Sequence, residues 1–151
     1  IRDDLVTGVQ TCALPIYAHV ANAQAVAEYL EKHPKVNWVN YAGLVSSQYF
    51  DLAQQYLPKG PGAIFTFGVS GGRAAGAKFI ESLQVISHLA NVGDARTLVI
   101  HPASTTHQQL SEEALATGGV SEDMVRISVG LEDLDDIIWD LDQALSKASE
   151  L

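Results

Sequence analysis

Apolar side chains recur with helical spacing at both ends of the chain. Between about residues 18 and 32 they share one side of a helix, formed by Val20, Ala23, Ala27 and Leu30. The dipeptide HP at 33–34 ends this helix, because proline disfavours a helical conformation in the residue before it. Residues 131–149 carry the clearest pattern, a narrow apolar stripe opposite a row of acids, formed by Leu131, Leu134, Ile138, Leu141 and Leu145. The spacing predicts an amphipathic helix in both places.

Strands and helices alternate between these two segments. β-Branched and aromatic runs predict strands at 36–41, 62–69 and 124–130, with two further short strands around a turn at Gly93–Asp94. Helical spacing predicts helices at 46–57, 71–84 and 111–119, the first with Ser46 or Ser47 as its N-cap. This order favours a single α/β domain in which helices cover a small sheet.

Residues 1–17 differ from the rest of the chain. Neither helical nor strand spacing runs through IRDDLVTGVQTCALPI, and Pro15 interrupts both patterns. The stretch VTGVQTCALPI resembles translated sequencing-adapter read-through. We therefore expect a non-native leader at 1–17, in which Cys12 carries no chemistry, and a folded domain at 18–151.

Charge and composition narrow the class of protein. The 151 residues suit one domain, and a net charge of −9 with singly scattered basic residues argues against nucleic-acid binding. The acids near the C-terminus predict a solvated helix face, namely Glu132, Asp133, Asp135, Asp136, Asp140 and Asp142. One cysteine excludes an internal disulfide, and no apolar run is long enough to span a membrane. The first residues do not read as a secretory signal, so we expect a cytoplasmic protein.

Two stretches invite a catalytic interpretation. FGVSGGRAAGAKF runs from strand to helix, but its glycines lack dinucleotide-binding spacing and no Gly-Lys-Ser/Thr follows. We therefore expect a turn at Gly71–Gly72 and close helix packing at Gly76. In LVIHPASTTH, His101 and His107 have no nearby carboxylate or thiol as a third metal ligand, and Ser104 lacks a nucleophile elbow. The local alternative is that His101 ends a strand and the hydroxyl groups after it bond to the backbone.

Arg126 is the strongest single candidate for binding a ligand. In MVRISVG, strand alternation places Arg126 and Ser128 on the side opposite Val125, Ile127 and Val129. A guanidinium on a strand suits bidentate capture of a carboxylate. The alternative is a surface arginine paired with an acid of the last helix.

Four segments, in their order along the chain, carry a resemblance to a known family. They are EYLEKHPKVNWVNYAGL, LPKGPGAIFTFGV, SHLANVGDARTLVIHPASTTHQQLSEE and VRISVGLEDLDDII. Together they resemble the cysteine and methionine metabolism family of pyridoxal-phosphate (PLP) enzymes, and within it the O-acetylhomoserine sulfhydrylases. The resemblance runs from about His19 to the C-terminus, and its motifs are far more specific jointly than singly.

The resemblance implies the small C-terminal α/β domain of a fold type I PLP-dependent transferase. Full-length members convert O-acetylhomoserine and sulfide, or a small thiol, to homocysteine or its thioether and acetate, usually as homotetramers. In that family the arginine that matches Arg126 holds the substrate carboxylate, and the residue that matches Asn91 supports it. The HPASTTH stretch borders the active-site entrance, which makes rim candidates of His101, Thr105, Thr106 and His107.

The same resemblance predicts an incomplete enzyme. The family's Schiff-base lysine lies in a Ser-x-Thr-Lys motif, which none of Lys32, Lys35, Lys59, Lys78 and Lys147 matches. We therefore expect a fragment of a sulfhydrylase that is inactive alone, with no catalytic residue and no bound PLP or metal. The alternative is a stand-alone domain that binds a carboxylate or another subunit without catalysis. Trp139 falls away from the stripe of the last helix and is expected to be exposed.

Overall fold

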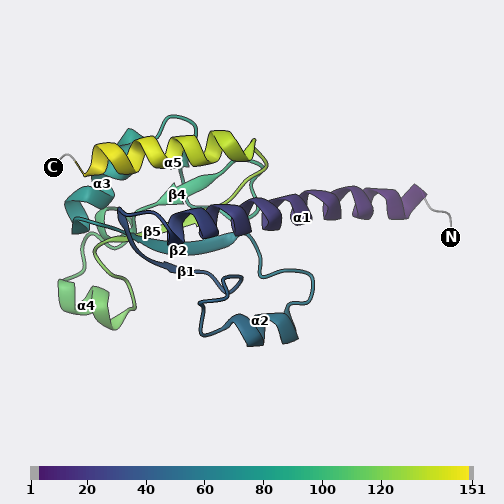
Figure 1. The fold of residues 1–151 in the computed structure, drawn as a ribbon, viewed down its shortest axis with the longest axis horizontal. Coiled ribbons are helices and arrows are strands. Elements are labelled where there is room, and N and C mark those ends of the chain that lie inside the picture. The colour runs from purple at the N-terminus through teal and green to yellow at the C-terminus, as the bar shows by residue number, and fades with distance from the viewer. Residues whose placement is uncertain (1–3, 150–151) are drawn as a thin grey trace.

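The structure is a computed structural model that describes the backbone of residues 4–149 and the side-chain surroundings of residues 16–149, apart from Glu112 and Ala116. Strands and helices alternate as the sequence predicts (Figure 1). In chain order the elements are α1 (Asp4–Glu31), β1 (Val36–Asn40), α2 (Phe50–Tyr56), β2 (Ile64–Val69), α3 (Gly72–Ser82), β3 (Ser87–His88), β4 (Leu98–Ile100), the 3-10 turn η1 (Pro102–Ser104), α4 (Glu112–Thr117), β5 (Met124–Ser128) and α5 (Leu134–Ala148).

The five strands form one mixed sheet in the order β1-β2-β5-β4-β3. The neighbouring strands pair antiparallel except β3 and β4, which pair in parallel. The helix α5 contacts both α1 and α3, and Figure 1 shows α1 and α5 lying along the sheet. This is the small helix-covered sheet of the predicted α/β fold class, which is confirmed.

One hydrophobic core joins the sheet to its helices. Alternate residues of the central strand β5 and its neighbour β2 are buried in it: Phe65, Phe67 and Val69 from β2, and Val125 and Ile127 from β5. The helices add Ala23, Val26, Ala27 and Leu30 from α1, Phe79 from α3, and Ile137, Leu141, Ala144 and Leu145 from α5. Because strand side chains alternate between the faces, the residues between those core positions point to the opposite face of the sheet. Arg126 is one of them.

The predicted start of the first helix is wrong. α1 begins at Asp4 instead of near residue 18, and it continues through Pro15. A proline removes one backbone hydrogen bond and kinks a helix, but the flanking turns can continue on either side of it. Among the described helices none is long and apolar enough to cross a membrane.

Two details of the middle of the chain also differ from the prediction. The N-cap of α2 is Tyr49 instead of Ser46 or Ser47. Ser47 belongs to the turn before the helix, where the carbonyl oxygen of Ser47 accepts from the backbone N–H of Phe50 at 3.0 Å. The two short strands around Gly93–Asp94 exist, but they pair in parallel, so residues 89–97 form a loop that crosses between them. That loop carries Asn91.

The predicted apolar stripe of α5 is correct in part, because Leu141 and Leu145 are buried and Leu134 packs against the core. Leu131 precedes the helix, whose N-cap is Asp133, and it is 38% exposed. The buried face consists of Ile137, Leu141, Ala144, Leu145 and Ala148, with Asp140 among them. The prediction missed Ile137 and the two alanines, and the alanines complete a helical face with little side-chain volume.

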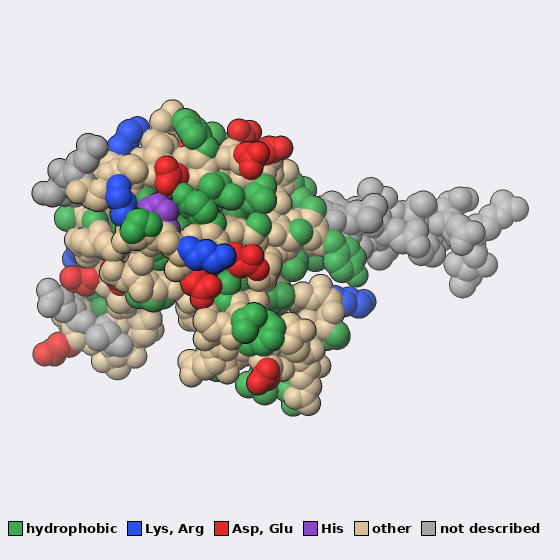
Figure 2. Space-filling view, in the orientation of Figure 1, with side chains coloured by type: hydrophobic (Ala, Val, Ile, Leu, Met, Phe, Trp, Pro, Cys, Tyr) green, Lys and Arg blue, Asp and Glu red, His purple; other side chains and the backbone are tan. Residues whose placement is uncertain are grey.

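The predicted solvated acidic face therefore holds only in part. Figure 2 shows acidic side chains gathered where α5 begins, and Asp135 and Asp136 lie in its first turn. Asp142 is exposed and accepts a 2.8 Å hydrogen bond from the Tyr29 hydroxyl, which together with nearby His33 lowers the pKa of Asp142. Asp140, by contrast, is fully buried. Trp139 is 51% exposed, which confirms the prediction for that side chain.

Removing residues 1–16 is expected to leave the melting temperature unchanged or to raise it. Figure 1 shows the N-terminal part of α1 projecting past the sheet, and Ile16 and Tyr17 are 60% and 52% exposed where it leaves the domain. The buried residues described on α1 begin at His19. Thermal unfolding of chains 1–151 and 17–151, followed by circular dichroism, measures the effect. A clearly lower melting temperature for the shorter chain would show that residues 1–16 pack against the domain.

Candidate functional site

Arg126 lies at the centre of the sheet face opposite the helices. It sits in the middle of β5, where its backbone pairs with Thr66 of β2 on one side and with Ile100 of β4 on the other. The residue is half-buried, so its guanidinium reaches the surface from a rigid central strand. Within the described part of the chain Arg126 forms no ion pair, and α5 lies on the other face. The alternative pairing with an acid of the last helix is therefore not what the structure shows.

The structure brings Arg126 and Asn91 together. The Arg126 guanidinium donates from Nη2 to the backbone carbonyl oxygen of Asn91 at 3.4 Å. The side-chain oxygen of Asn91 accepts from the backbone N–H of Val92 at 2.8 Å, and both residues are exposed. Periodicity within either segment does not reveal this proximity, because the two residues are 35 positions apart and are brought together by the tertiary fold.

His101 lies in the interior of the domain. It is fully buried, and its Nε2–H donates to the backbone carbonyl oxygen of Glu122 at 2.8 Å. Its Nδ1 lies 2.8 Å from the Ser104 hydroxyl oxygen, and in a neutral ring this nitrogen accepts from the hydroxyl. Burial lowers the pKa of His101 and so favours that neutral form. Gly76 of α3 packs directly against the ring, so that a Cβ atom at this position would collide with the ring. The expected close packing at Gly76 is confirmed.

In the rest of the HPASTTH stretch, Thr105 bonds to the backbone of the turn, whereas Thr106 lies on the surface. The hydroxyl of Thr105 donates to the carbonyl oxygen of His101 at 2.8 Å, as expected if hydroxyl groups satisfy the backbone after the strand. Thr106 is exposed, and its hydroxyl lies 2.8 Å from Nδ1 of the half-buried His107. Of the four rim candidates, Thr106 and His107 are thus the two whose side chains form no hydrogen bond within the turn after β4 other than the contact between them.

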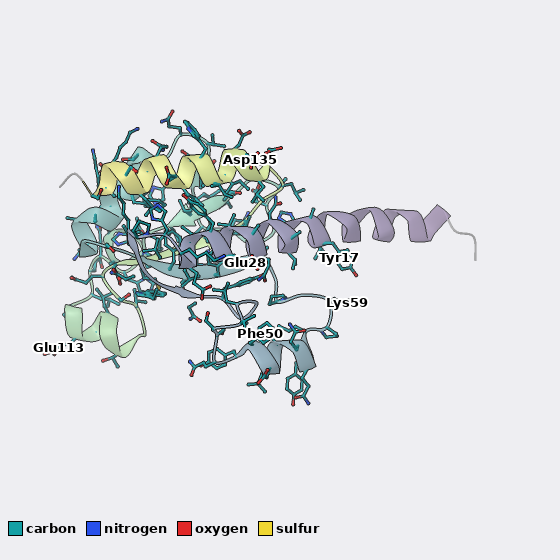
Figure 3. The ribbon with its side chains drawn as sticks, viewed as in Figure 1. Tyr17, Glu28, Phe50, Lys59, Glu113 and Asp135 are labelled. Atoms are coloured by element: carbon teal, nitrogen blue, oxygen red, sulfur yellow. The ribbon has the colours of Figure 1, made fainter. Side chains whose placement is uncertain are left out.

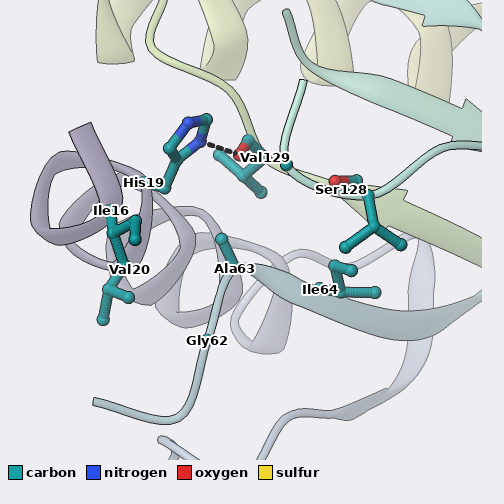
Figure 4. Close-up of a pocket in the computed structure, with 10 residues that line it drawn as sticks. Ile16, His19, Val20, Gly62, Ala63, Ile64, Ser128 and Val129 are labelled. Atoms are coloured by element: carbon teal, nitrogen blue, oxygen red, sulfur yellow. Dashed lines mark hydrogen bonds between the residues drawn. The ribbon is translucent and has the colours of Figure 1, made fainter. Parts of the chain in front are cut away.

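A small apolar cavity lies beside the strand that carries Arg126 (Figure 4). Val20 of α1, Ile64 of β2, Val92 of the 89–97 loop and Ser128 of β5 line it. On its α1 side the buried ring of His19 donates from Nδ1 to the carbonyl oxygen of Val129 at 2.7 Å. This bond fixes the end of β5 against α1. The sequence contained no signal for it, because a lone histidine in a helix has many possible partners.

The described residues do not form a site for a cofactor or a metal. Lys32, Lys59, Lys78 and Lys147 are exposed and Lys35 is half-buried. Lys32 and Lys35 lie in the turn after α1, Lys59 lies after α2 (Figure 3), and Lys78 and Lys147 lie on α3 and α5. A covalently held PLP needs a lysine that faces a phosphate-binding cradle. In the same part of the chain no three His, Cys, Asp or Glu side chains come together as metal ligands. What the geometry offers is a cation, Arg126, beside a polar loop.

The chain matches one protein-family model and is similar in sequence to several curated proteins. The family described as Cys/Met metabolism PLP-dependent enzyme matches residues 4–146. The chain is 51% identical over 144 residues to the homocysteine synthase of Schizosaccharomyces pombe, covering 95% of this chain and 34% of that protein. It is 52% identical over 139 residues to O-acetyl-L-homoserine sulfhydrylase 1 of Thermus thermophilus, covering 92% and 33%. The chain thus spans about a third of the length of these curated relatives.

Two solved structures are similar to this chain in fold and in sequence. The crystal structure of a putative O-acetylhomoserine (thiol)-lyase from Campylobacter jejuni, with N'-pyridoxyl-lysine-5'-monophosphate at position 205, matches with a TM-score of 0.84 and 38% identity, covering 94% of this chain and 34% of that one. Cystathionine gamma synthase from Xanthomonas oryzae, in complex with aminoacrylate and cysteine, matches with a TM-score of 0.84 and 35% identity, covering 95% and 37%.

Proposed function

Because the family match covers nearly the whole chain, this chain belongs to the Cys/Met metabolism PLP-dependent enzymes, and we propose that it supplies the substrate-carboxylate side of the active site of an O-acetylhomoserine sulfhydrylase. The reaction would join O-acetylhomoserine with sulfide or a small thiol to give homocysteine or its thioether and acetate. The pair formed by Arg126 and Asn91 is the observation that carries the proposal.

The chemistry of this pair suits the α-carboxylate of an amino-acid substrate. Arg126 presents a planar cation with several N–H donors, and its one described contact, a long 3.4 Å bond to the carbonyl oxygen of Asn91, leaves donors for a ligand. Its position on the central strand β5 holds the guanidinium in a fixed place, which orients the substrate. Thr106 and His107 are proposed to border the entrance to the same site.

The cofactor of this family would be bound by the longer protein. When present, PLP supplies the electron-withdrawing group that weakens bonds at the amino-acid substrate. The lysines described above do not fit that role, so we derive no step through the cofactor. The contribution of this chain is to hold and orient the substrate carboxylate. We propose that the complete enzyme is a cytoplasmic homotetramer that acts on small molecules, without binding nucleic acid or membranes.

A second candidate function, an interaction domain without catalysis, has one observation in its favour. Exposed apolar side chains lie on and beside α2, namely Val45, Tyr49, Leu52, Tyr56 and Leu57. Such a cluster is typical of a surface that is covered in an assembly. In the first proposal the rest of the sulfhydrylase covers it. In the second, the domain itself binds another subunit.

A chimera tests the first proposal. Residues 18–151 replace the matching third of the Thermus thermophilus relative, and the expected result is homocysteine formation from O-acetylhomoserine and sulfide. The isolated chain serves as the control, because it is expected to gain no borohydride-fixable PLP absorbance at a specific lysine and to show no turnover. A folded, PLP-loaded chimera that leaves O-acetylhomoserine unchanged would contradict the proposed function. Specific labelling of one lysine in the isolated chain would contradict the assignment of PLP to the rest of the enzyme.

A further inference from the structure

Glu132 ties together two segments that the sequence separates by 35 positions. Its Oε1 accepts from the backbone N–H of Thr97 at 2.6 Å, and its Oε2 accepts from the Thr97 hydroxyl at 2.7 Å. The oxygen of that hydroxyl in turn accepts from the backbone N–H of Gly130 at 2.9 Å. Thr97 is completely buried, so these charge-assisted bonds are shielded from water on that side.

The close approach of the two segments also requires Gly130. A Cβ atom at this position would collide with the backbone of Arg96 and Thr97 and with the Glu132 carboxylate. Next to it, the backbone N–H of Leu131 donates to the carbonyl oxygen of Ala95 at 2.8 Å. The segment 130–132 is therefore joined to residues 95–97 by both side-chain and backbone hydrogen bonds.

Helix α1 holds the same segment from its other side. The side-chain amide of Asn22 donates to the carbonyl oxygens of Gly130 and Glu132 at 3.2 and 3.1 Å. With the bond from His19 to the carbonyl oxygen of Val129, α1 fixes the chain just beyond β5. Glu132 consequently projects from a rigid support, although its own side chain belongs to a loop.

Both members of the proposed carboxylate-binding pair adjoin this junction. Arg126 lies on β5, whose chain continues directly into 130–132, and Asn91 lies on the 89–97 loop, which ends at Thr97. The other end of that loop is held directly after β3, where the backbone N–H of Leu89 donates to the carbonyl oxygen of Val99 at 3.1 Å. The position of Asn91 relative to Arg126 thus depends on how the two ends of the loop are held, and the bonds between Thr97 and Glu132 hold one of these ends together with the backbone bonds around them.

We propose that Glu132 is a positioning residue for substrate binding: through Thr97 it holds the loop that carries Asn91 at the distance from Arg126 that the substrate carboxylate requires. This inference rests on the proposed function of the Arg126–Asn91 pair. Glu132 touches neither the substrate nor Arg126 in this arrangement. Its loss would loosen the loop and weaken recognition of the carboxylate, while leaving contacts to the rest of the substrate in place.

The test compares a ligand that has the carboxylate with one that lacks it. In the chimera, norvaline and butylamine, its decarboxylated counterpart, serve as competitive inhibitors against O-acetylhomoserine. Glu132→Ala is expected to raise the inhibition constant of norvaline about tenfold, and that of butylamine by less than about twofold. The KM for O-acetylhomoserine should rise together with the inhibition constant of norvaline. The KM for sulfide should stay unchanged. Glu81→Gln, at an exposed glutamate of α3, is the matched control.

Two milder variants keep the test decisive if Glu132→Ala does not fold. Glu132→Gln retains one carbonyl oxygen for the Thr97 N–H, and Thr97→Val removes only the hydroxyl, so each is expected to give a smaller shift in the same direction. Thr97→Ser, which keeps the hydroxyl, should restore parental inhibition. Equal changes for norvaline and butylamine, or a loss of kcat alone, would overturn the positioning role.

Arg126→Lys separates this inference from the function on which it rests. If Arg126→Lys weakens norvaline binding but the Glu132 and Thr97 variants do not, the positioning role fails and the proposed function stands. If Arg126→Lys leaves norvaline binding unchanged, the proposed function itself fails. If both the Arg126 and the Glu132 variants lose the discrimination between norvaline and butylamine, the result supports the proposed function and the positioning role of Glu132.

Discussion

Replacing Arg126 with lysine in the full-length chimera is expected to weaken O-acetylhomoserine binding by roughly 10- to 150-fold. A charge-assisted hydrogen-bonded contact is worth about 1.5–3 kcal/mol, and a lysine ammonium cannot reproduce the planar fork of the guanidinium. The lysine side chain is also shorter in its reach toward two oxygens at once, so the substrate would lose orientation as well as affinity. The effect should appear in kcat/KM for O-acetylhomoserine.

The control for this variant is the second substrate. Sulfide has no carboxylate, so its KM should be unaffected by Arg126→Lys. Circular dichroism should show the same fold, because Arg126 lies on the sheet face away from the helix-covered core. Parental kinetics for O-acetylhomoserine would mean that Arg126 is structural, and the site would have to lie elsewhere on the chain.

Replacing Asp140 with alanine is expected to lower the free energy of unfolding of the chain by about 3 kcal/mol. The buried Asp140 carboxylate accepts from the backbone N–H groups of Gln84, Val85 and Ile86 at 2.8, 2.9 and 2.8 Å. It also accepts from the side-chain amide of Gln143 at 2.9 Å. These bonds join α5 to the segment that follows α3, and alanine would leave the backbone donors without their partner.

Urea unfolding followed by fluorescence measures this loss, with two variants for comparison. Asp140→Asn keeps one acceptor oxygen, so it should cost about half as much as Asp140→Ala. Asp136→Ala removes an exposed acid from the first turn of the same helix, where the interaction with the helix dipole is worth less than about 1 kcal/mol. Equal destabilisation by Asp140→Ala and Asp136→Ala would show that the buried network contributes little.

Local sequence determined which segments form helices and which form strands, for most of the chain, and on which face of the sheet Arg126 lies. Hydrophobic spacing placed the strands around 64–69 and 124–128 and the helices that follow them, because period and burial are linked within a single element. Alternation along β5 was enough to put Arg126 on the face opposite Val125 and Ile127. The four quoted motifs were enough to identify the family, since their joint order is specific.

Only the tertiary structure decided which polar residues hold the domain together. Asp140 and Glu132 belong to the acidic run that the pattern assigned to solvent, yet their partners lie 54–56 and 35 positions away. The buried state of His101 and the parallel pairing of β3 with β4 depend in the same way on distant segments. A charged or polar side chain is buried only where the fold supplies its hydrogen bonds, and those donors and acceptors come from other elements. Spacing along one element cannot contain that information, whereas the exposure of a large apolar residue such as Trp139 follows from the face on which it lies.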